Sequence, residues 1–455
     1  MSDRVDWTWA RSRRTLGVFA LATGAGIAAV LLDASVATRA ALVAGVCLLL
    51  WLTAWVPVWI PTIVLWVATP LLLAARDGRF TPLEVVRWSV DPVLALFLGG
   101  FALAAAAKHH GVDVVVADFS LKRAGNSAAR LVAIAALATT FLSMWMSNVA
   151  AAALMLHAFR PIWGKEAQGS ALRGSLLLGI ALAANVGGIA TPIGTGANGI
   201  AMAAVAHTRP IGFLNWMVFG VPLAVGFAAI AVMLVLLRFR PPKLLVQSNE
   251  IARSADTPGA SLALYRRFAI IFSLTVLLWL TEPLHGIAAW MISLGAVVSL
   301  LVSQVISWRE LVQIDWGTLM LVAGGIGLGA LLDQSGIVAD MATALPLTNV
   351  PVTMRLLGLC LLGATLSALM SNTGTAAFLI PLAATLDPAP STAIIVAVAC
   401  SLGMPFAVST PANAMAVAGG LRTTDLLVPG LILMVGGCVL VALTGPFVLG
   451  MVGIP

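Results

Sequence analysis

The sequence predicts an all-α polytopic membrane protein with about eleven transmembrane helices plus two re-entrant hairpins. Of its 455 residues, 60% are hydrophobic and 9% are charged, whereas soluble domains are about 45–50% apolar and about 25% charged. The apolar runs are long and continuous, as in Ala40 to Val56 and Leu426 to Gly450. A transmembrane β-barrel would show short alternating segments instead. Since a helix crosses a bilayer with about 20 residues, about a dozen crossings fit.

The apolar segments place these crossings in chain order. The first follows Arg11, Arg13 and Arg14 and is too long for a signal peptide, so we expect it to be retained. We expect crossings at about 15–32, 40–56, 58–75, 91–107, 174–207, 214–237, 268–282, 286–304, 317–332, 391–420 and 426–449. Two further stretches, 128–163 and 351–387, are too long for one crossing and have a polar break at the middle. Both are predicted to be re-entrant hairpins.

The distribution of basic residues predicts the orientation in the membrane. With the N-terminus inside, the cytoplasmic loops hold most of the 25 Lys and Arg residues: four in the tail, four in 108–130, three in 160–173, six in 238–267, and Arg309 and Arg422. This asymmetry follows the positive-inside rule. We therefore expect a multi-pass protein of the cell (inner) membrane, with a cytoplasmic N-terminus and the C-terminus outside. The net charge of +7 then reflects these loops and not nucleic-acid binding.

Three pairs of motifs recur in the same order in the two halves of the chain. Ser147-Asn148-Val149 matches Ser371-Asn372-Thr373, Gly99-Gly100 matches Gly324-Gly325, and the segment 194–198 (Gly-Thr-Gly-Ala-Asn) matches 409–413 (Ser-Thr-Pro-Ala-Asn). Five crossings separate the starts of the two copies, so the copies enter the membrane from opposite sides. The chain therefore contains an inverted repeat, which is the architecture of many secondary transporters.

This repeat divides the chain into five parts. We expect N-terminal scaffold helices at 1–90, the first inverted repeat at 91–237 (hairpin tip 147–149, broken helix 174–207), a cytoplasmic linker at 238–267, further scaffold helices at 268–316, and the second inverted repeat at 317–455 (hairpin tip 371–373, broken helix 391–420).

The four breaks in these helices predict a binding site for an anion. Unpaired backbone groups at bilayer depth are tolerated only where protein buries them or a wet cavity receives them, so we expect the breaks to meet in one cavity. The helix that restarts after each break offers free N–H groups and a partial positive charge. Asn148, Asn198, Asn372 and Asn413 lie at or beside these restarts, where Asn binds an anion or caps the helix.

A second duplicated pattern predicts a cation site. Ser143 precedes Ser147 by one helical turn, as Ser367 precedes Ser371, so each pair lies on one helix face. Hydroxyl, amide and freed carbonyl oxygens form a neutral cage suited to a hard monovalent cation. Serine is also a common small packing residue in membrane helices. Its duplication at equivalent places favours the cage.

Acidic residues fall in tails, loops or helix ends, so none is available to relay protons at the membrane centre. Proton coupling is therefore disfavoured, and so is a cation/proton antiporter, which needs an acid in its broken helices. We expect His157 to be a packed neutral histidine. The four cysteines stand singly in apolar runs, and no nucleophile or metal motif of an intramembrane enzyme is present. The chain is predicted not to be an enzyme.

Taken together, the paired hairpin tips and the paired segments 194–198 and 409–413 resemble those of the divalent-anion sodium symporter family, which transports dicarboxylates, citrate or sulfate. The resemblance covers residues 15 to 450. It implies a homodimer in membrane lipid, in which a transport part slides along a scaffold like an elevator.

The resemblance also implies the ligands. One sodium ion would be bound by Ser143, Ser147, Asn148 and the carbonyl of Gly194, the other by Ser367, Ser371, Asn372 and the carbonyl of Ser409. The substrate would contact Asn148, Asn372 and Thr373, with Thr195, Thr410 and Pro411 behind. Val149 stands where the family has Thr, so a hydroxyl is missing beside the substrate. The expected function is sodium-coupled transport of a C4-dicarboxylate. The alternatives are a sodium-independent dicarboxylate exchanger and a sulfate or citrate transporter.

Overall fold

The computed structural model describes residues 13–125, 127–164, 166–167, 170–206, 208–241, 262–344, 350–387 and 389–454. Within these residues the chain is helical and contains no strand. Eight of the described helices are long and apolar enough to cross a membrane. Two of these eight are the first arms of the predicted hairpins, and both predicted broken helices are present as pairs of shorter helices. The predicted all-α polytopic fold is confirmed.

The N-terminal helices come first in the chain. They are α1 (Arg13–Leu31), α2 (Val36–Thr53), α3 (Ile60–Leu73), the 3₁₀ turn η2 (Gly78–Phe80) and α4 (Pro82–Trp88). Helix α2 begins four residues before the predicted start, because the Ser35 hydroxyl caps it by accepting from Thr38 N. Arg39 then lies inside the helix and is buried, with its guanidinium bonded to the carbonyls of Ala34 and Leu72.

The first half of the repeat contains the first hairpin and the first broken helix. Its helices are α5 (Pro92–His109), α6 (Val112–Ala124), α7 (Ala128–Trp145), α8 (Asn148–Ala158), α9 (Arg160–Trp163), α10 (Ala171–Gly187), α11 (Gly196–Val205) and α12 (Phe213–Phe239). The hairpin tip lies between α7 and α8, and residues 188–195 are unwound between α10 and α11. Both breaks fall inside the stretches where the sequence predicts them.

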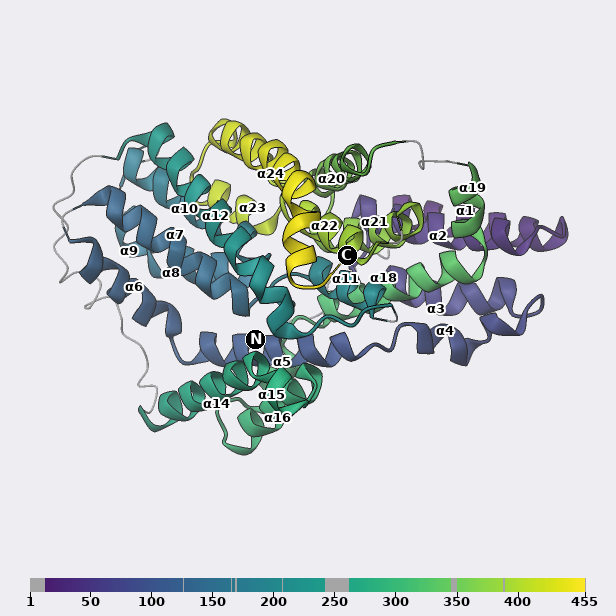
Figure 1. The fold of residues 1–455 in the computed structure, drawn as a ribbon, viewed down its shortest axis with the longest axis horizontal. Helices are drawn as coiled ribbons and strands as arrows, with labels where there is room; N and C mark the ends of the chain where they lie inside the picture. The colour runs from purple at the N-terminus through teal and green to yellow at the C-terminus, as the bar shows by residue number, and fades with distance from the viewer. Residues whose placement is uncertain are drawn as a thin grey trace.

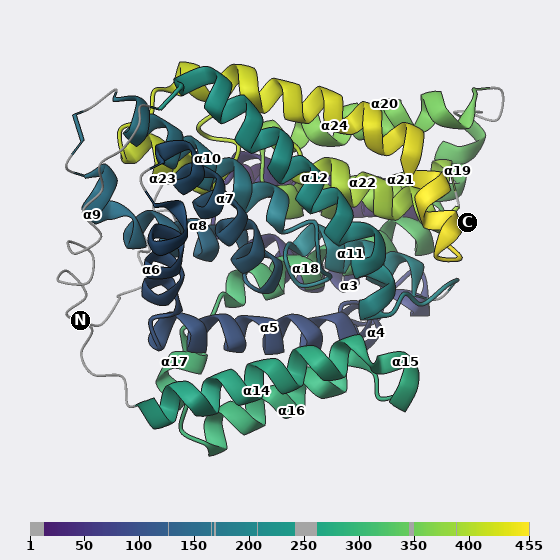
Figure 2. The same ribbon diagram turned by 60° about the vertical axis from the view of Figure 1, so that its left-hand side comes forward.

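Between the two halves, the described residues from 262 onward form four helices. They are α14 (Leu262–Leu280), α15 (Glu282–His285), α16 (Ala289–Val302) and α17 (Trp308–Val312). Helices α14 and α16 run beside α5 in both views (Figures 1 and 2). The predicted linker at 238–267 lies outside the described residues from 242 to 261, and its ends belong to α12 and α14.

The second half repeats the elements of the first. Its helices are α18 (Trp316–Gln334), α19 (Ile337–Ala344), α20 (Val352–Leu369), α21 (Asn372–Leu386), α22 (Pro390–Ser401), α23 (Pro411–Ala418) and α24 (Thr423–Met451). The second hairpin tip lies between α20 and α21, and residues 402–410 are unwound between α22 and α23. The long helix α24 corresponds to α12.

The two duplicated glycine pairs have the same packing role. A Cβ atom at Gly99 would lie 2.5 Å from Ser293 Cβ of α16, and one at Gly324 would lie 2.2 Å from Thr62 Oγ1 of α3. Such distances are far below van der Waals contact, so only glycine fits. The neighbouring glycine of each pair faces the other way, Gly100 against Ile193 and Gly325 against Ala377. Helices α5 and α18 are therefore held between outer helices on one side and the hairpins and broken helices on the other.

The two halves exchange the second parts of their broken helices. Helix α11 of the first half packs against α21 and α22 of the second, and α23 of the second half packs against α8 and α10 of the first. Figure 1 shows α23 among the blue helices of the first half and α11 beside the green helices of the second. Reciprocal contacts of this kind arise between units related by a two-fold rotation. The exchange brings all four breaks together.

Candidate functional site

The first hairpin tip is built so that a serine caps the helix and an asparagine remains free. Ser147 is the N-cap residue of α8, and its hydroxyl accepts from Ala150 N at 3.3 Å. Asn148 is the first residue of the helix and does not cap it. The interpretation of Asn148 as a structural cap therefore does not hold, because the preceding serine fills that role. The Asn148 carboxamide points back toward α7 and the unwound segment.

Three oxygen-bearing groups gather around the Asn148 side chain: the Ser143 hydroxyl and the carbonyls of Ala184 and Gly194. The Ser143 hydroxyl donates to the Ala184 carbonyl at 2.7 Å and accepts from the Asn148 carboxamide nitrogen at 2.9 Å. With its amide nitrogen turned inward, Asn148 lies 3.1 Å from Ala184 O and 3.3 Å from Gly194 O. The sequence names Ser143, Asn148 and Gly194 for this site, and the structure brings them together. It adds the Ala184 carbonyl, a backbone group that residue identity does not reveal.

Two glycines allow this close gathering. A Cβ atom at Gly188 would lie 2.3 Å from Asn148 Oδ1, and one at Gly194 would lie 2.4 Å from Gly188 O. Gly188 has ordinary right-handed backbone angles (φ −61°, ψ −17°). Space is therefore the constraint at this position, and the backbone conformation is open to any residue.

The second hairpin tip repeats the arrangement with its own residues. Ser371 caps α21 by accepting from Gly374 N at 3.0 Å. The single proton of the Ser367 hydroxyl is shared between two acceptors, the Cys400 carbonyl at 2.5 Å and Asn372 Oδ1 at 2.8 Å. Ser367 and Asn372 thus meet as predicted, joined by the Cys400 carbonyl in the place of Ala184. The same hydroxyl, amide and carbonyl set occurs twice.

Ser409 has a positioning role in the second unwound segment. Its hydroxyl donates to the Ala368 carbonyl at 2.8 Å and accepts from Phe406 N at 3.1 Å. In the first half, the Thr191 hydroxyl bonds to the matching carbonyl of Met144. Each hairpin is therefore tied to its unwound segment by a hydroxyl group.

Asn198 and Asn413 hold the unwound segments in shape. Asn198 Nδ2 donates to the carbonyls of Gly188 and Thr191, both at 2.8 Å. Asn413 Nδ2 donates to Met404 O at 3.0 Å and Phe406 O at 2.9 Å. Both side chains are fully buried. Their amide groups satisfy carbonyls that the break leaves without helical partners, so these two asparagines brace the loops.

Two contacts join the halves at the breaks. Asn185, near the end of α10, donates from Nδ2 to Asn413 Oδ1 in α23 at 3.0 Å. Thr373, in the first turn of α21, packs on Gly196 at the start of α11, where a Cβ atom would lie 2.6 Å from Thr373 Oγ1. Gly196 therefore leaves room for Thr373. The tip of one hairpin meets the restart of the other half's broken helix.

The residues predicted to contact the substrate differ in exposure. Asn148, Asn372 and Thr373 are half-buried, Val149 is 42% exposed and Pro411 is exposed. The two threonines behind them are buried, and Thr410 caps α23 by accepting from Asn413 N at 3.2 Å. Thr195 is the N-cap residue of α11 but makes no capping bond with its side chain. The hairpin tips and Pro411 are therefore accessible, whereas the two threonines that precede the helix restarts are covered.

The buried carboxylates among the described residues have arginine partners, and the histidine of the first hairpin is exposed. The buried carboxylates of Asp387 and Asp425 lie at helix ends and pair with Arg355 at 3.1 Å and with Arg238 at 2.5 Å. His157 is exposed on α8, so the expectation of a packed histidine is wrong. Helix α8 is short and rich in alanine, so its sequence has no clear apolar face. The helical pattern therefore could not show whether His157 points outward or into the protein.

Comparison with known proteins identifies the family. The model of the citrate transporter family (CitMHS) matches residues 48–403. An uncharacterized transporter of Haemophilus influenzae is 28% identical over 417 residues, covering 84% of this chain and 88% of the relative. The sodium-dependent dicarboxylate transporter SdcS of Staphylococcus aureus is 26% identical over 415 residues, covering 79% of each chain.

A solved structure shares the fold. The crystal structure of the YdaH transporter of Alcanivorax borkumensis matches with a TM-score of 0.57 and 16% identity, covering 90% of this chain and 98% of the other. The family model spans most of the chain, including both hairpins and the first broken helix. The chain therefore belongs to the citrate transporter family, whose members are membrane transporters and not enzymes.

Proposed function

We propose that the protein is a secondary active transporter that moves a divalent anion, a C4-dicarboxylate in the first place, across the cell membrane together with sodium ions. The observation that carries this proposal is the duplicated set of hydroxyl, carboxamide and carbonyl groups at the two hairpin tips. Each set lies at the first turn of a helix, α8 or α21, where backbone N–H groups are free.

The two oxygen clusters are the proposed sodium sites. Unwound carbonyls in discontinuous helices coordinate coupling ions in secondary transporters. The first site is formed by Ser143, Ser147, Asn148 and the Gly194 carbonyl, with the Ala184 carbonyl in addition. The second is formed by Ser367, Ser371, Asn372 and the Ser409 carbonyl, with the Cys400 carbonyl in addition. Sodium is the transported ion here, and its charge would offset that of the anion beside it.

The substrate is proposed to lie between the two tips. The N-terminal ends of α8 and α21 carry partial positive charge and attract carboxylates without a formal cation. Asn148, Asn372 and Thr373 would contact the substrate, with Thr195, Thr410 and Pro411 behind. Val149 has a side chain similar in size and shape to threonine, but it cannot form a hydrogen bond with the substrate at the first tip. One carboxylate would thus have one partner fewer than the other.

Transport is proposed to proceed by an elevator motion in a homodimer of the inner membrane, with the N-terminus in the cytoplasm and the C-terminus outside. Residues 1–90 and 268–316 would form the scaffold, and the hairpins with the broken helices would move against it. The relation to SdcS, named as a sodium-dependent dicarboxylate transporter, supports the choice of sodium and dicarboxylate. The citrate transporter family model makes citrate the first competitor to test.

The test is a counterflow assay with purified protein in liposomes loaded with succinate. We expect uptake of labelled succinate to require sodium and to be lost when potassium replaces it. Ser143→Ala and Ser367→Ala should each weaken sodium dependence, whereas Ser175→Ala should not, because the Ser175 hydroxyl bonds only within its own helix. Flux that ignores sodium would contradict symport and identify an exchanger. If citrate or sulfate competes more strongly than succinate for uptake, the assignment of a dicarboxylate as the substrate would be wrong.

A further inference from the structure

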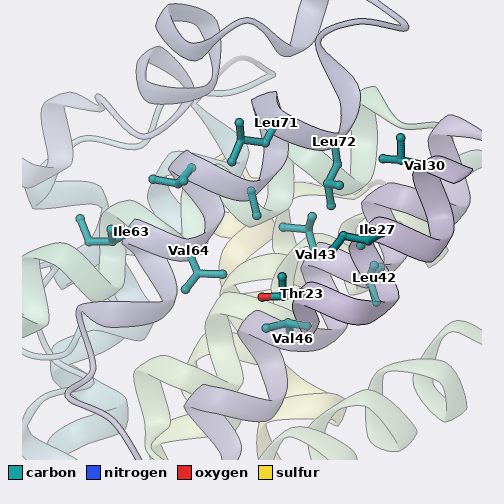
Figure 3. A pocket seen from close by; sticks show the side chains of 13 residues that line it. Thr23, Ile27, Val30, Leu42, Val43, Val46, Ile63, Val64, Leu71 and Leu72 are labelled. Atoms are coloured by element: carbon teal, nitrogen blue, oxygen red, sulfur yellow. The ribbon is translucent and has the colours of Figure 1, made fainter. Parts of the chain in front are cut away.

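An apolar groove lies between the first three helices, far from the hairpin tips. It has a volume of about 580 Å³, within the range of small-molecule binding sites. Its walls come from α1, α2 and α3, and Figure 3 shows their side chains converging on a common space. The lining residues are Thr23, Gly26, Ile27, Val30, Leu42, Val43, Val46, Ile63, Val64, Val67, Ala68, Leu71 and Leu72.

The surroundings of the groove determine what fills it. These helices are apolar, and α2 is long and apolar enough to cross a membrane. Water does not occupy apolar cavities of this kind, and an unfilled space would lose the dispersion contacts of its walls. Along α3 the lining runs from Ile63 to Leu72, about 14 Å at 1.5 Å per residue. This length is about half of the 30 Å hydrocarbon core, the depth of one lipid leaflet.

Two arginines lie at the end of the groove where α3 ends. Arg39 Nη1 donates to the carbonyl of the lining residue Leu72 at 2.8 Å, and its side chain is 5% exposed. Arg76 follows Leu72 by one helical turn, is 36% exposed and pairs with Asp33, which is 79% exposed. The two arginines and one carboxylate leave one net positive charge. An ion pair this exposed is weak, so Arg76 is available to a stronger anionic partner.

We propose that the groove binds an anionic phospholipid, with one acyl chain between α1, α2 and α3 and the phosphate at Arg76. An apolar slot one leaflet deep with a cation at its end matches a molecule with an apolar tail and an anionic head. Guanidinium groups bind phosphate through paired, charge-assisted hydrogen bonds. A transmembrane helix of a second copy would fill the slot without placing an anion at Arg76.

The first test fills the groove and counts bound lipid. A Cβ atom at Gly26 would lie 3.5 Å from Leu72 Cδ2, whereas one at Gly24 would meet nothing within 4 Å. Gly26→Leu therefore puts a branched side chain into the slot, and Gly24→Leu places the same side chain on the same helix in open space. Purified protein is titrated with phosphatidylglycerol or phosphatidylcholine of identical acyl chains, and bound lipids are counted by native mass spectrometry. We expect Gly26→Leu to lose the tightest phosphatidylglycerol and Gly24→Leu to keep it.

The second test removes the headgroup contact. Arg76→Gln should weaken phosphatidylglycerol binding about tenfold, the value of a lost charged hydrogen bond, and should leave phosphatidylcholine binding unchanged. Arg79→Gln is the control, because Arg79 is exposed and bonds to Asp77 at 2.7 Å. This pair of variants also decides the question if Gly26→Leu fails to fold.

Three outcomes would overturn the proposal. Equal phosphatidylglycerol binding by wild type and Gly26→Leu would place the lipid elsewhere. An equal loss of phosphatidylglycerol binding in Arg76→Gln and Arg79→Gln would show that the lipid responds to general surface charge and not to a specific contact with Arg76. Conversion of a dimer to a monomer by Gly26→Leu, without a change in bound lipid, would make the groove a contact between copies of the chain.

Discussion

Asn148 and Asn372 are the first residues of α8 and α21, one position after the N-cap. In both hairpins the preceding serine accepts the capping hydrogen bond, from Ala150 N or Gly374 N. The carboxamide is thereby directed to the Ser143 or Ser367 hydroxyl. The serine of the Ser-Asn dipeptide thus caps the helix, and the adjacent asparagine side chain is left to serve as the proposed ligand.

Gly188 offers a steric test of the first cluster. The substitution Gly188→Ala would put a Cβ atom 2.3 Å from Asn148 Oδ1, so the carboxamide must move while the backbone stays relaxed. We expect the apparent sodium affinity, measured from thermal stabilisation at increasing sodium concentration, to fall at least about tenfold. This loss corresponds to about 1.4 kcal/mol of binding free energy. Gly179→Ala, on the same helix, adds a Cβ at an ordinary 3.5 Å from Val132 and should behave as wild type. Unchanged sodium affinity in Gly188→Ala would argue against Asn148 as a ligand.

Val149 tests the substrate position. Restoring the hydroxyl with Val149→Thr should tighten dicarboxylate binding by about 1 kcal/mol, the usual net value of a hydrogen bond. The reciprocal variant Thr373→Val should weaken it by a similar amount. Isothermal titration in saturating sodium measures both. An unaffected Val149→Thr variant would mean that the substrate does not reach the first tip.

At the scale of elements, the unwound segments are held by one asparagine each. Asn198→Ala removes both donors to the carbonyls of Gly188 and Thr191 and should lower the free energy of unfolding by about 2 kcal/mol. Asn413→Ala should cost more, because Asn413 Oδ1 also accepts from Asn185. Chemical denaturation in detergent compares the two variants. The opposite order, or no loss in either, would contradict the bracing role.

The elements themselves were largely predictable. Long apolar runs interrupted by Ser-Asn or Thr-rich motifs located both hairpins and both broken helices, because such interruptions stand out against a hydrophobic background. Their extent was harder to predict. Unwinding begins at residues 188 and 402, before the motifs at 194–198 and 409–413, which mark the restart. Tertiary bonds from Asn198 and Asn413 stabilise the open stretch, and such distant partners leave no local signal.

The candidate site was predictable to the same partial extent. Side chains such as Ser143, Asn148, Ser367 and Asn372 were found from their duplication. The Ala184 and Cys400 carbonyls were not, because every residue carries a carbonyl and only the fold selects which one is aimed at the hydroxyl. Asn185 was missed because it lies within an apolar helix and has no counterpart in the second half, where Ser401 bonds only to its own helix.

At the scale of the whole molecule, the halves are coupled where their breaks meet. Asn185 adjoins Ala184, a member of the first cluster, and bonds to Asn413 beside the second unwound segment. If the two sodium sites are linked through this bond, Asn185→Ala should lower the Hill coefficient for sodium toward one while both sites still bind. Ser401→Ala, at the equivalent place, is the control. If the Hill coefficient for sodium in Asn185→Ala stays at the wild-type value, any coupling between the two sites must depend on another contact.

The uncharged character of the side chains at the breaks has an energetic consequence for the transport cycle. In the proposed elevator motion, an empty site made only of dipoles would return across the bilayer without moving formal charge. The membrane potential would then act on the loaded carrier alone. A dianion accompanied by two sodium ions would then cross electrically silent. A third sodium ion would couple each turnover to voltage, at about 2.3 kcal/mol per 100 mV for each charge moved. Cargo composition would thus decide whether the cell's electrical gradient drives accumulation.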